Sequence, residues 1–264
     1  MDVKVIECAL GEIESFIIDH ATKNKITVDG YWEDHVIKSN HYKMTNDDEI
    51  VGYFAIFKEG DDPHKDAILT LFNVFPPFAN KSQELFAIAK KYETVTHAMV
   101  AIGDEAFLSH CFDNFSKIEK LAYIFEYITG VNPKPQPDFK LAETEADYET
   151  FKIAKGFLDE EIKQLQSGVK HLEIYIAEKN NETIGFGIIE YGRILKNIAS
   201  IGMYVCENYR RQGFAVDILL GMKKIVNDKG LKALSGCWYY NHNSKKSIEK
   251  AGGYCKTRYI KFYF

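Results

Sequence analysis

The two halves of the sequence repeat one order of predicted elements. The stretches 46–60 (NDDEIVGYFAIFKEG) and 179–192 (KNNETIGFGIIEYG) begin 133 residues apart, and each has the pattern of a polar turn followed by a β-rich run with one early glycine. The next predicted strands, 67–75 and 198–206, begin 131 residues apart, and each precedes a segment with the apolar spacing of a helix. A repeat of this length that contains strands and helices predicts a duplicated α/β domain.

A proline-rich stretch separates the two halves. The segment 131–139 (VNPKPQPDF) holds three of the six prolines of the 264-residue chain. Alternating prolines favour an extended backbone and stop helices. We therefore predict a first domain at 1–130, a linker at 131–138 and a second domain at 139–264.

The second half has the pattern of a mixed α/β domain with one long amphipathic helix after its central strand. Strands are predicted at 139–143, 172–178, 183–190, 198–206 and 232–240, and from 254 to the end. Helices are predicted across 146–166, at 214–229 and at 244–251.

The composition narrows the function classes. The net charge is −5, which disfavours a protein that grips nucleic acid through a chain-wide basic field. Apolar runs fall short of the roughly 20 residues that span a bilayer, and the N-terminal stretch lacks the pattern of a secretory signal. The five cysteines have no C-x-x-C spacing, and no H-E-x-x-H is present. We expect a cytoplasmic protein with reduced thiols, no metal, no membrane partner and no nucleic-acid partner.

A helix that follows two arginines is the first candidate site. In 208–224 (NYRRQGFAVDILLGMKK), Arg210 and Arg211 precede a helix start, where the macrodipole disfavours cations. The unpaired N–H groups of that first turn, together with Gly213 and the small Ala215, predict an anion site that accounts for the arginines. The alternative is a solvated loop whose arginines cover a nearby acidic surface.

A second candidate lies after the next strand. In 239–253 (YYNHNSKKSIEKAGG), Asn241 or Asn243 is a natural helix N-cap, and Lys245 and Lys246 fall in the first turn. Exposed lysines at helix ends are common, so they carry little weight. Asn241 offers a donor and an acceptor to a polar ligand.

Together the two stretches resemble a known family. VCENYRRQGFA (205–215) is similar to the acyl-CoA motif of the GCN5-related N-acetyltransferases (GNAT), Arg/Gln-x-x-Gly-x-Gly/Ala, with Arg210, Gly213 and Ala215 at its fixed positions. Asn241, Ser244 and the Lys-Ala-Gly at 250–252 resemble the second motif of that family. The resemblance covers about 139–264 and implies two tandem acyl-CoA N-acyltransferase-like domains of mixed α/β fold.

The resemblance also implies a cofactor site for acetyl-CoA. The pantetheine arm would pair with the strand end, the loop N–H groups would hold the pyrophosphate, and the acetyl group would lie where strands 198–206 and 232–240 diverge. The residues implied are Met203, Tyr204, Val205, Arg210, Arg211, Gln212, Gly213, Phe214, Ala215, Asn241 and Ser244. The reaction implied is direct attack of a neutral amine on the thioester, which needs a base and a donor for the oxyanion.

Two positions depart from the family pattern. Many members carry a tyrosine acid seven residues after the asparagine, and here that residue is Ile248. Some carry a glutamate early in the central strand, where this chain has IASIG. Glu190 is the nearest candidate base, and its alternative is an exposed strand-end carboxylate. The remaining proton donors are Tyr239, Tyr240 and Ser244, although strand tyrosines usually pack.

The first half lacks the phosphate-loop pattern. Its matching stretch, 74–86 (VFPPFANKSQELF), has no glycine and no arginine, and Pro76 and Pro77 remove two N–H groups. We therefore expect a degenerate GNAT-like domain that serves as a scaffold and does not bind the cofactor.

The predicted function is transfer of an acetyl group from acetyl-CoA to a primary amine of a small molecule or peptide. The alternatives are a tandem acyltransferase of the mycothiol-synthase or Fem type, the latter using charged tRNA, and a non-catalytic acyl-CoA-binding regulator. The sequence indicates neither the acceptor nor the oligomeric state.

Overall fold

A computed structural model describes residues 2–58, 66–131 and 137–264, so most of the predicted linker, residues 132–136, lies outside the described part. The chain divides into two compact units. Unit 1 comprises Met1–Ala122 and Thr257–Phe264, and unit 2 comprises Tyr123–Lys256. The last segment of the sequence therefore belongs to the first unit.

Unit 1 is a sheet with helices. Its elements are β1 (Val3–Cys8), α1 (Leu10–Lys23), α2 (Gly30–Ile37), β2 (Asn40–Asn46), β3 (Glu49–Lys58), β4 (Ala67–Val74), α3 (Ser82–Lys91), β5 (Val95–Ala101) and α4 (Glu105–Phe112). The strands lie in the order β1-β2-β3-β4-β5-β12, where β12 spans Gly253–Tyr263. Within unit 1, β12 pairs antiparallel with β5, from Tyr259 opposite Ala101 to Tyr263 opposite His97. β12 thus lies between β5 and β6 (Lys117–Tyr127), whose residues up to Ala122 also belong to unit 1.

Unit 2 repeats this plan. Its elements are β7 (Asp138–Leu141), α5 (Glu145–Thr150), α6 (Asp159–Gln166), β8 (Leu172–Lys179), β9 (Glu182–Tyr191), β10 (Ile198–Val205), α7 (Phe214–Asp228), β11 (Lys232–Trp238) and α8 (His242–Lys250). The end of β6 (Lys117–Tyr127) joins them, in the strand order β6-β11-β10-β9-β8-β7. The pairing of β10 with β11 is parallel and that with β9 is antiparallel, so the sheet is mixed.

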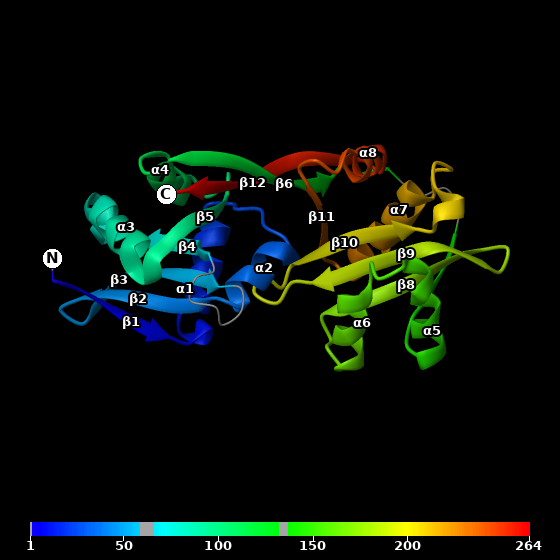
Figure 1. The fold of residues 1–264 in the computed structure, drawn as a ribbon, viewed down its shortest axis with the longest axis horizontal. Helices are drawn as coiled ribbons and strands as arrows, with labels where there is room; N and C mark the ends of the chain where they lie inside the picture. The colour runs from blue at the N-terminus through cyan, green and yellow to red at the C-terminus, as the bar shows by residue number, and fades with distance from the viewer. Residues whose placement is uncertain (1, 59–65, 132–136) are drawn as a thin grey trace. The chain divides into compact units, whose positions relative to one another are not determined.

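Helices cover both faces of the unit 2 sheet (Figure 1). On one face, α7 buries an apolar stripe that includes Ile218, Leu219 and Met222 against β9 and β10. On the other, Phe151 and Leu158 from the α5–α6 region pack on Phe186. Alternate residues of each strand therefore face the two layers, as the period of 2 in a strand requires.

The predicted elements of the second half are present, with two differences. The helical stretch 146–166 consists of two helices, because the backbone turns left-handed at Lys155 and Gly156 between α5 and α6. The strands predicted from 254 onward form the single strand β12, whose part from Thr257 belongs to unit 1. The compact units thus differ from the predicted domains at the C-terminal strand and at residues 123–130, which lie in unit 2. The sequence boundary at 131–138 stays a prediction.

Candidate functional site

Two central strands of unit 2 separate along their length. The parallel ladder between β10 and β11 runs from Ile198 opposite Lys232 to Ser200 opposite Leu234. Beyond it, β10 continues to Val205 and β11 to Trp238. The predicted divergence is therefore present. We call the space between the two strand ends beyond Ser200 and Leu234 the fork.

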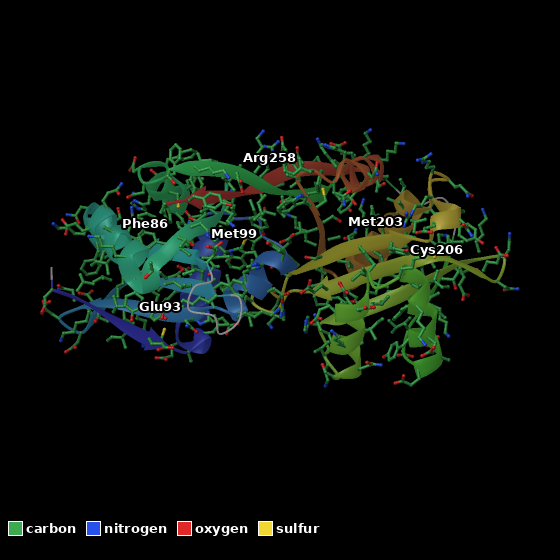
Figure 2. The ribbon with its side chains drawn as sticks, in the orientation of Figure 1. Phe86, Glu93, Met99, Met203, Cys206 and Arg258 are labelled. Carbon is green, nitrogen blue, oxygen red and sulfur yellow. The ribbon has the colours of Figure 1, made fainter. Side chains whose placement is uncertain are left out.

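One edge of β10 offers backbone groups to the fork. The Ile201 carbonyl accepts a hydrogen bond from Ser235 Oγ of β11 at 2.8 Å, and the Val205 carbonyl accepts one from Arg210 Nε at 3.1 Å. Because alternate residues of a strand point their backbone groups to the same edge, Met203 between them also faces the fork. Figure 2 shows Met203 on β10 and Cys206 just beyond its end. Met203 and Val205 are thus placed to pair with an extended ligand.

Tyr204 plays a different part from its neighbours. Tyr204 lies between Met203 and Val205, so its backbone groups point to the opposite edge of β10, toward β9 and away from the fork. Its ring lies 5.0 Å from the ring of Phe157, a side chain that is 55% exposed, on the α5–α6 side of the sheet. Tyr204 therefore contributes an aromatic surface beside the fork.

The loop after β10 turns sharply into α7. Arg211 and Gly213 both have positive φ, 64° and 95°, and Gly213 is the N-cap of the helix. The Gly213 carbonyl already accepts from the N–H of Val216 at 2.9 Å, whereas the N–H groups of Phe214 and Ala215 have no acceptor within the helix. A Cβ added at Gly213 would meet nothing within 4 Å. The loop therefore presents open backbone donors at the positive helix pole, which is an anion-binding arrangement.

The polar side chains of this loop are directed by local contacts. Arg210 bends back so that its guanidinium lies 5.8 Å from the Tyr204 ring centroid while its Nε donates to the Val205 carbonyl. Arg211 is exposed, and Gln212 donates to the Asn208 carbonyl at 3.0 Å. Sequence reasoning missed Lys179, whose Nζ lies 5.0 Å from the ring of Phe214 and brings a third cation to the start of α7.

The second motif forms the start of α8. Of the two predicted caps, Asn241 is the N-cap, and its Oδ1 accepts from the Ser244 N–H at 3.1 Å. Its amide nitrogen remains as a donor for a ligand. Lys245 lies 3.7 Å from Glu249 and 4.8 Å from the Tyr123 ring, so this cation needs no bound anion.

Glu190 lies on β9 opposite Ser200, beside the root of the fork. Its Oε1 accepts from Arg193 Nη2 at 3.1 Å, and 27% of its side chain is exposed. Glu190 thus lies on the strand next to β10, at the level of Ser200, and its carboxylate is engaged in an ion pair. That pairing favours the strand-end alternative over a free base.

The residue at the position of the family acid, and the three other proton donors named from the sequence, lie in different surroundings. Ile248 is 2% exposed in the core. Tyr239 stacks on Tyr123 with ring centroids 4.9 Å apart, which is a packing role, whereas Tyr240 is 65% exposed. Ser244 gives its backbone N–H to the cap of α8.

Two residues at the root of the fork were missed. Ser235 is 1% exposed, and its hydroxyl accepts a hydrogen bond from Tyr127 at 2.7 Å while donating to Ile201. Tyr127 stands 108 residues earlier, at the end of β6. No local pattern could have joined them, because a strand pattern does not name its partner strand.

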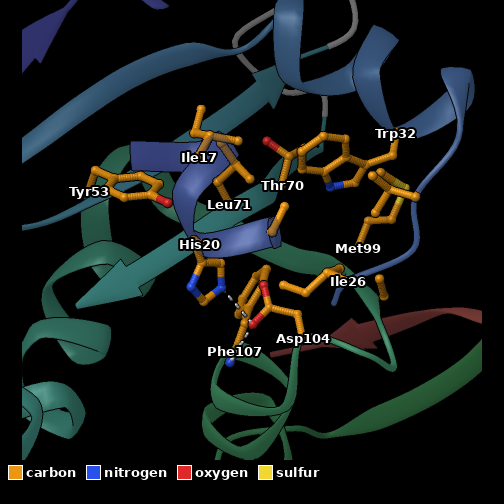
Figure 3. Close-up of a pocket in the computed structure, with 13 residues that line it drawn as sticks. Ile17, His20, Ile26, Trp32, Tyr53, Thr70, Leu71, Met99, Asp104 and Phe107 are labelled. Atoms are coloured by element: carbon orange, nitrogen blue, oxygen red, sulfur yellow. Dashed lines mark hydrogen bonds and ion pairs between the residues drawn. The ribbon is translucent and has the colours of Figure 1, made fainter. Parts of the chain in front are cut away.

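The equivalent strands of unit 1 enclose a packed region. The parallel ladder between β4 and β5 ends at Leu69 opposite Ala98. Beyond it lies a cavity of about 20 Å³, lined by Ile17, His20, Ala21, Ile26, Val28, Trp32, Tyr53, Thr70, Leu71, Met99, Ala101, Asp104 and Phe107 (Figure 3). That volume suits a water molecule and not an acyl group.

The cavity of unit 1 has one polar pair in its wall. His20 Nε2 donates to Asp104 Oδ1 at 3.2 Å (Figure 3). Its Nδ1 accepts from Asn24 at 3.1 Å. Both ring nitrogens are thus engaged, and Asp104 is also the N-cap of α4. This pair ties α1 to α4.

The connection between β4 and α3 differs from the loop before α7. It forms a 3-10 helix, Pro76–Lys81, with prolines in its first turn, and no residue from 75 to 91 has a positive φ. Lys81 pairs with Glu84 at 3.0 Å. The open donors that surround Gly213 have no counterpart in this described stretch.

Within the described residues, no cluster of three or more histidine, cysteine or acidic side chains could hold a metal ion. Nor does any helix of the described segments have the length and apolarity needed to cross a membrane.

Family comparison identifies the class. A model described as "Acetyltransferase (GNAT) domain" matches residues 9–128, and one described as "Acetyltransferase (GNAT) family" matches residues 137–253. The chain belongs to the GNAT superfamily and consists of two tandem GNAT domains. The expectation of a merely degenerate first half is corrected by the first match: that half is a GNAT domain, even though its β4–α3 connection lacks the open loop.

Solved structures share the fold. An acetyltransferase from the GNAT family of Colwellia psychrerythraea has a TM-score of 0.84 at 21% identity, with 100% of each chain covered. A tandem GNAT protein from the clavulanic acid biosynthesis pathway has a TM-score of 0.68 at 11% identity, covering 99% of this chain and 98% of its own. A GCN5-related N-acetyltransferase from Sphaerobacter thermophilus has a TM-score of 0.65 at 10% identity, covering 98% and 94%. A search of curated proteins finds no match.

Proposed function

We propose that the protein is an N-acetyltransferase that uses acetyl-CoA and a primary amine, and that unit 2 carries the reaction. The observation that carries this proposal is the combination of the fork with the open loop at Gly213. The fork offers backbone groups of Met203 and Val205, and the loop offers N–H groups at the pole of α7. One extended ligand with an acyl thioester at one end and phosphates at the other fits both features.

The cofactor contacts proposed from the sequence lie along the fork and the loop at Gly213. The edge of β10 would pair with pantetheine amides, and the N–H groups of residues 210 to 215 would bind the pyrophosphate, although that of Arg210 also donates to the Glu207 carbonyl at 3.3 Å. Arg210 and Lys179 supply cations beside the same helix start. Asn241 would contact the ligand near the pantetheine through its amide nitrogen.

The acceptor would approach on the α5–α6 face, beside the exposed ring of Phe157 and the half-buried ring of Tyr204. A small-molecule or peptide amine suits this surface, and the net charge of −5 weighs against charged tRNA. The five cysteines are all free thiols, which supports a cytoplasmic location.

A second candidate is a non-catalytic acyl-CoA-binding protein. The burial of Ile248 where many family members have an acid, and the ion pair at Glu190, favour it. Thermal stability of the full chain with acetyl-CoA tests the binding shared by both candidates, and release of free CoA thiol across a panel of amines separates them. If acetyl-CoA causes no thermal shift at any reachable concentration, both candidate functions are ruled out. Capture of charged tRNA in place of acetyl-CoA would support a Fem-type transferase.

A further inference from the structure

A chain of two hydroxyl groups ends at the root of the fork. Ser235 Oγ donates to the Ile201 carbonyl at 2.8 Å, and this uses the one hydrogen of that hydroxyl. Tyr127 must therefore be the donor in its 2.7 Å contact with Ser235 Oγ. The order is Tyr127 to Ser235 to Ile201, and all three residues belong to unit 2.

The position of Ser235 follows from the ladder. Ser235 is the first residue of β11 beyond the last paired residue, Leu234, so it stands where the strands begin to separate. Ile201 is the next fork-facing residue after Met203, and alternate residues lie about 6.6–6.8 Å apart along a strand. A ligand paired with Val205 and Met203 and extending toward the root thus brings its thioester end toward Ser235.

The far end of the chain rests on a buried ammonium group. Lys223 Nζ lies 5.5 Å from the centroid of the Tyr127 ring and donates to the Ile128 carbonyl at 2.9 Å. Lys223 is 8% exposed, and burial lowers its pKa. Burial also raises the pKa of Tyr127 to about 12, so this phenol holds its proton at neutral pH. A cation beside the ring stabilises the phenolate when the phenol gives up its proton.

We propose that Ser235 is the acid that protonates the departing sulfur of CoA, and that Tyr127 is the positioning residue that resupplies its proton. The inference rests on the proposed function, since it concerns the leaving group of that reaction. In this proposal a residue of β11 and one of β6 supply the acid that Ile248 cannot provide. A hydroxyl hydrogen rotates freely, so Ser235 can turn from the Ile201 carbonyl to the sulfur.

The proton and electron balance is simple. The amine nitrogen forms a bond to the acyl carbon, and the C–S bond breaks with its electron pair on sulfur. Sulfur takes the proton of Ser235, which takes the phenolic proton of Tyr127. The new amide loses one N–H proton to water. Tyr127 recovers a proton from water through the groove that it lines with Lys223 and Ala233, so the products are the amide and CoA thiol.

The test measures the pKa of the CoA thiol bound to the full-length protein. Thiolate absorbance is followed against pH, with the complex of desulfo-CoA as the blank that cancels the five cysteines. A donor to the thiolate lowers the thiol pKa. Ser235→Ala should therefore raise the pKa of the bound thiol by about one unit, which is a tenfold decrease in its acidity. Tyr127→Phe keeps the ring and should raise it by a smaller amount.

Matched controls remove equivalent groups elsewhere in unit 2. Ser167→Ala removes a hydroxyl that donates to Gln164 at 2.7 Å, and Tyr254→Phe removes a phenol that donates to Glu126 at 2.8 Å. Both should leave the bound thiol unchanged. Equal thiol pKa values in the wild type, Ser235→Ala and Tyr127→Phe would overturn the inference. Absence of CoA and desulfo-CoA binding by the wild type would instead refute the proposed function.

Discussion

Tyr259 donates to Asp29 Oδ1 at 2.9 Å, across 230 residues of sequence. The Asp29 N–H in turn donates to the Tyr259 oxygen at 3.1 Å. Asp29 caps α2, and Tyr259 lies on β12, so this reciprocal pair holds the last strand of the chain inside unit 1. Both side chains are buried, and this gives the pair a pH dependence.

We expect Asp29→Asn to stabilise the protein at neutral pH. Burial raises the pKa of Asp29 to about 6. Because the folded pKa lies above the unfolded value of about 3.9, ionisation costs stability as pH rises from about 4 to 6, on the order of 3 kcal/mol in full. Asparagine still accepts from Tyr259 and still caps the helix. The urea midpoint of the wild type should fall relative to the variant over this pH range, and parallel midpoints would contradict the assignment.

Asp147 should show the opposite dependence. Its carboxylate accepts from Lys140, from the Thr144 hydroxyl and from two backbone N–H groups, and these contacts, led by Lys140, hold its pKa well below the usual range. Its stabilising effect is therefore present above about pH 4 and is lost as pH falls further. Asp147→Ala should cost about 1 kcal/mol at pH 7 through loss of the capping-box carboxylate, and the cost should be smaller at pH 3. Urea unfolding at pH 7 and pH 3 checks this.

Gly213→Val should abolish acetyl-CoA binding. A β-branched residue resists a φ of 95°, and its side chain occupies the open space that a phosphate needs. Gly168→Val is the matched control, since Gly168 also has a positive φ, 81°, with nothing within 4 Å of an added Cβ. Both variants should lose similar stability, about 1–2 kcal/mol. Calorimetric titration should show binding only in the control. Normal binding by the Gly213 variant would show that the phosphates do not bind at this loop.

Arg210→Ala should weaken acetyl-CoA binding by about 1.5–3 kcal/mol, as expected for a hydrogen bond to a charged group. The structure adds a specific expectation, because Arg210 also supports the end of β10 through Val205. Lys163→Ala, which removes an exposed cation on α6 paired only loosely with Glu160, should bind normally. Dissociation constants at two salt concentrations test this, since the phosphate contribution should fall with salt.

The full chain should bind one CoA. The β4–α3 connection of unit 1 lacks the open loop, and its cavity of about 20 Å³ is too small for an acyl group. Calorimetry of the intact protein should give a stoichiometry near one. The Gly213→Val variant distinguishes the units, because any residual saturable binding would reveal a site in unit 1. The intact chain is needed, since residues 1–130 alone would lack β12.

Local patterns predicted the fold well because the periods of strands and helices depend on residues that are close together in the sequence. The run from β8 to α8 follows alternation and turn residues, and the Arg210–Gly213 motif located the loop. Long-range pairing was beyond such patterns. The alternation in 258–264 predicts a strand equally well whether its partner is β5 or a strand of unit 2. In the same way, Tyr127 showed only an aromatic strand end, and its contact with Ser235 depends on which strands become neighbours.

The exchange of the C-terminal strand has a consequence for synthesis. During synthesis Thr257–Phe264 emerges after the whole of unit 2, and domains fold as their segments emerge. Unit 2 has its whole sequence once Lys256 is made, whereas unit 1, most of which precedes unit 2 in the sequence, still lacks Thr257–Phe264 at that point. Unit 1 thus acquires its full set of strands after unit 2 does. Until then the edge of β5 that pairs with β12 is open to other partners.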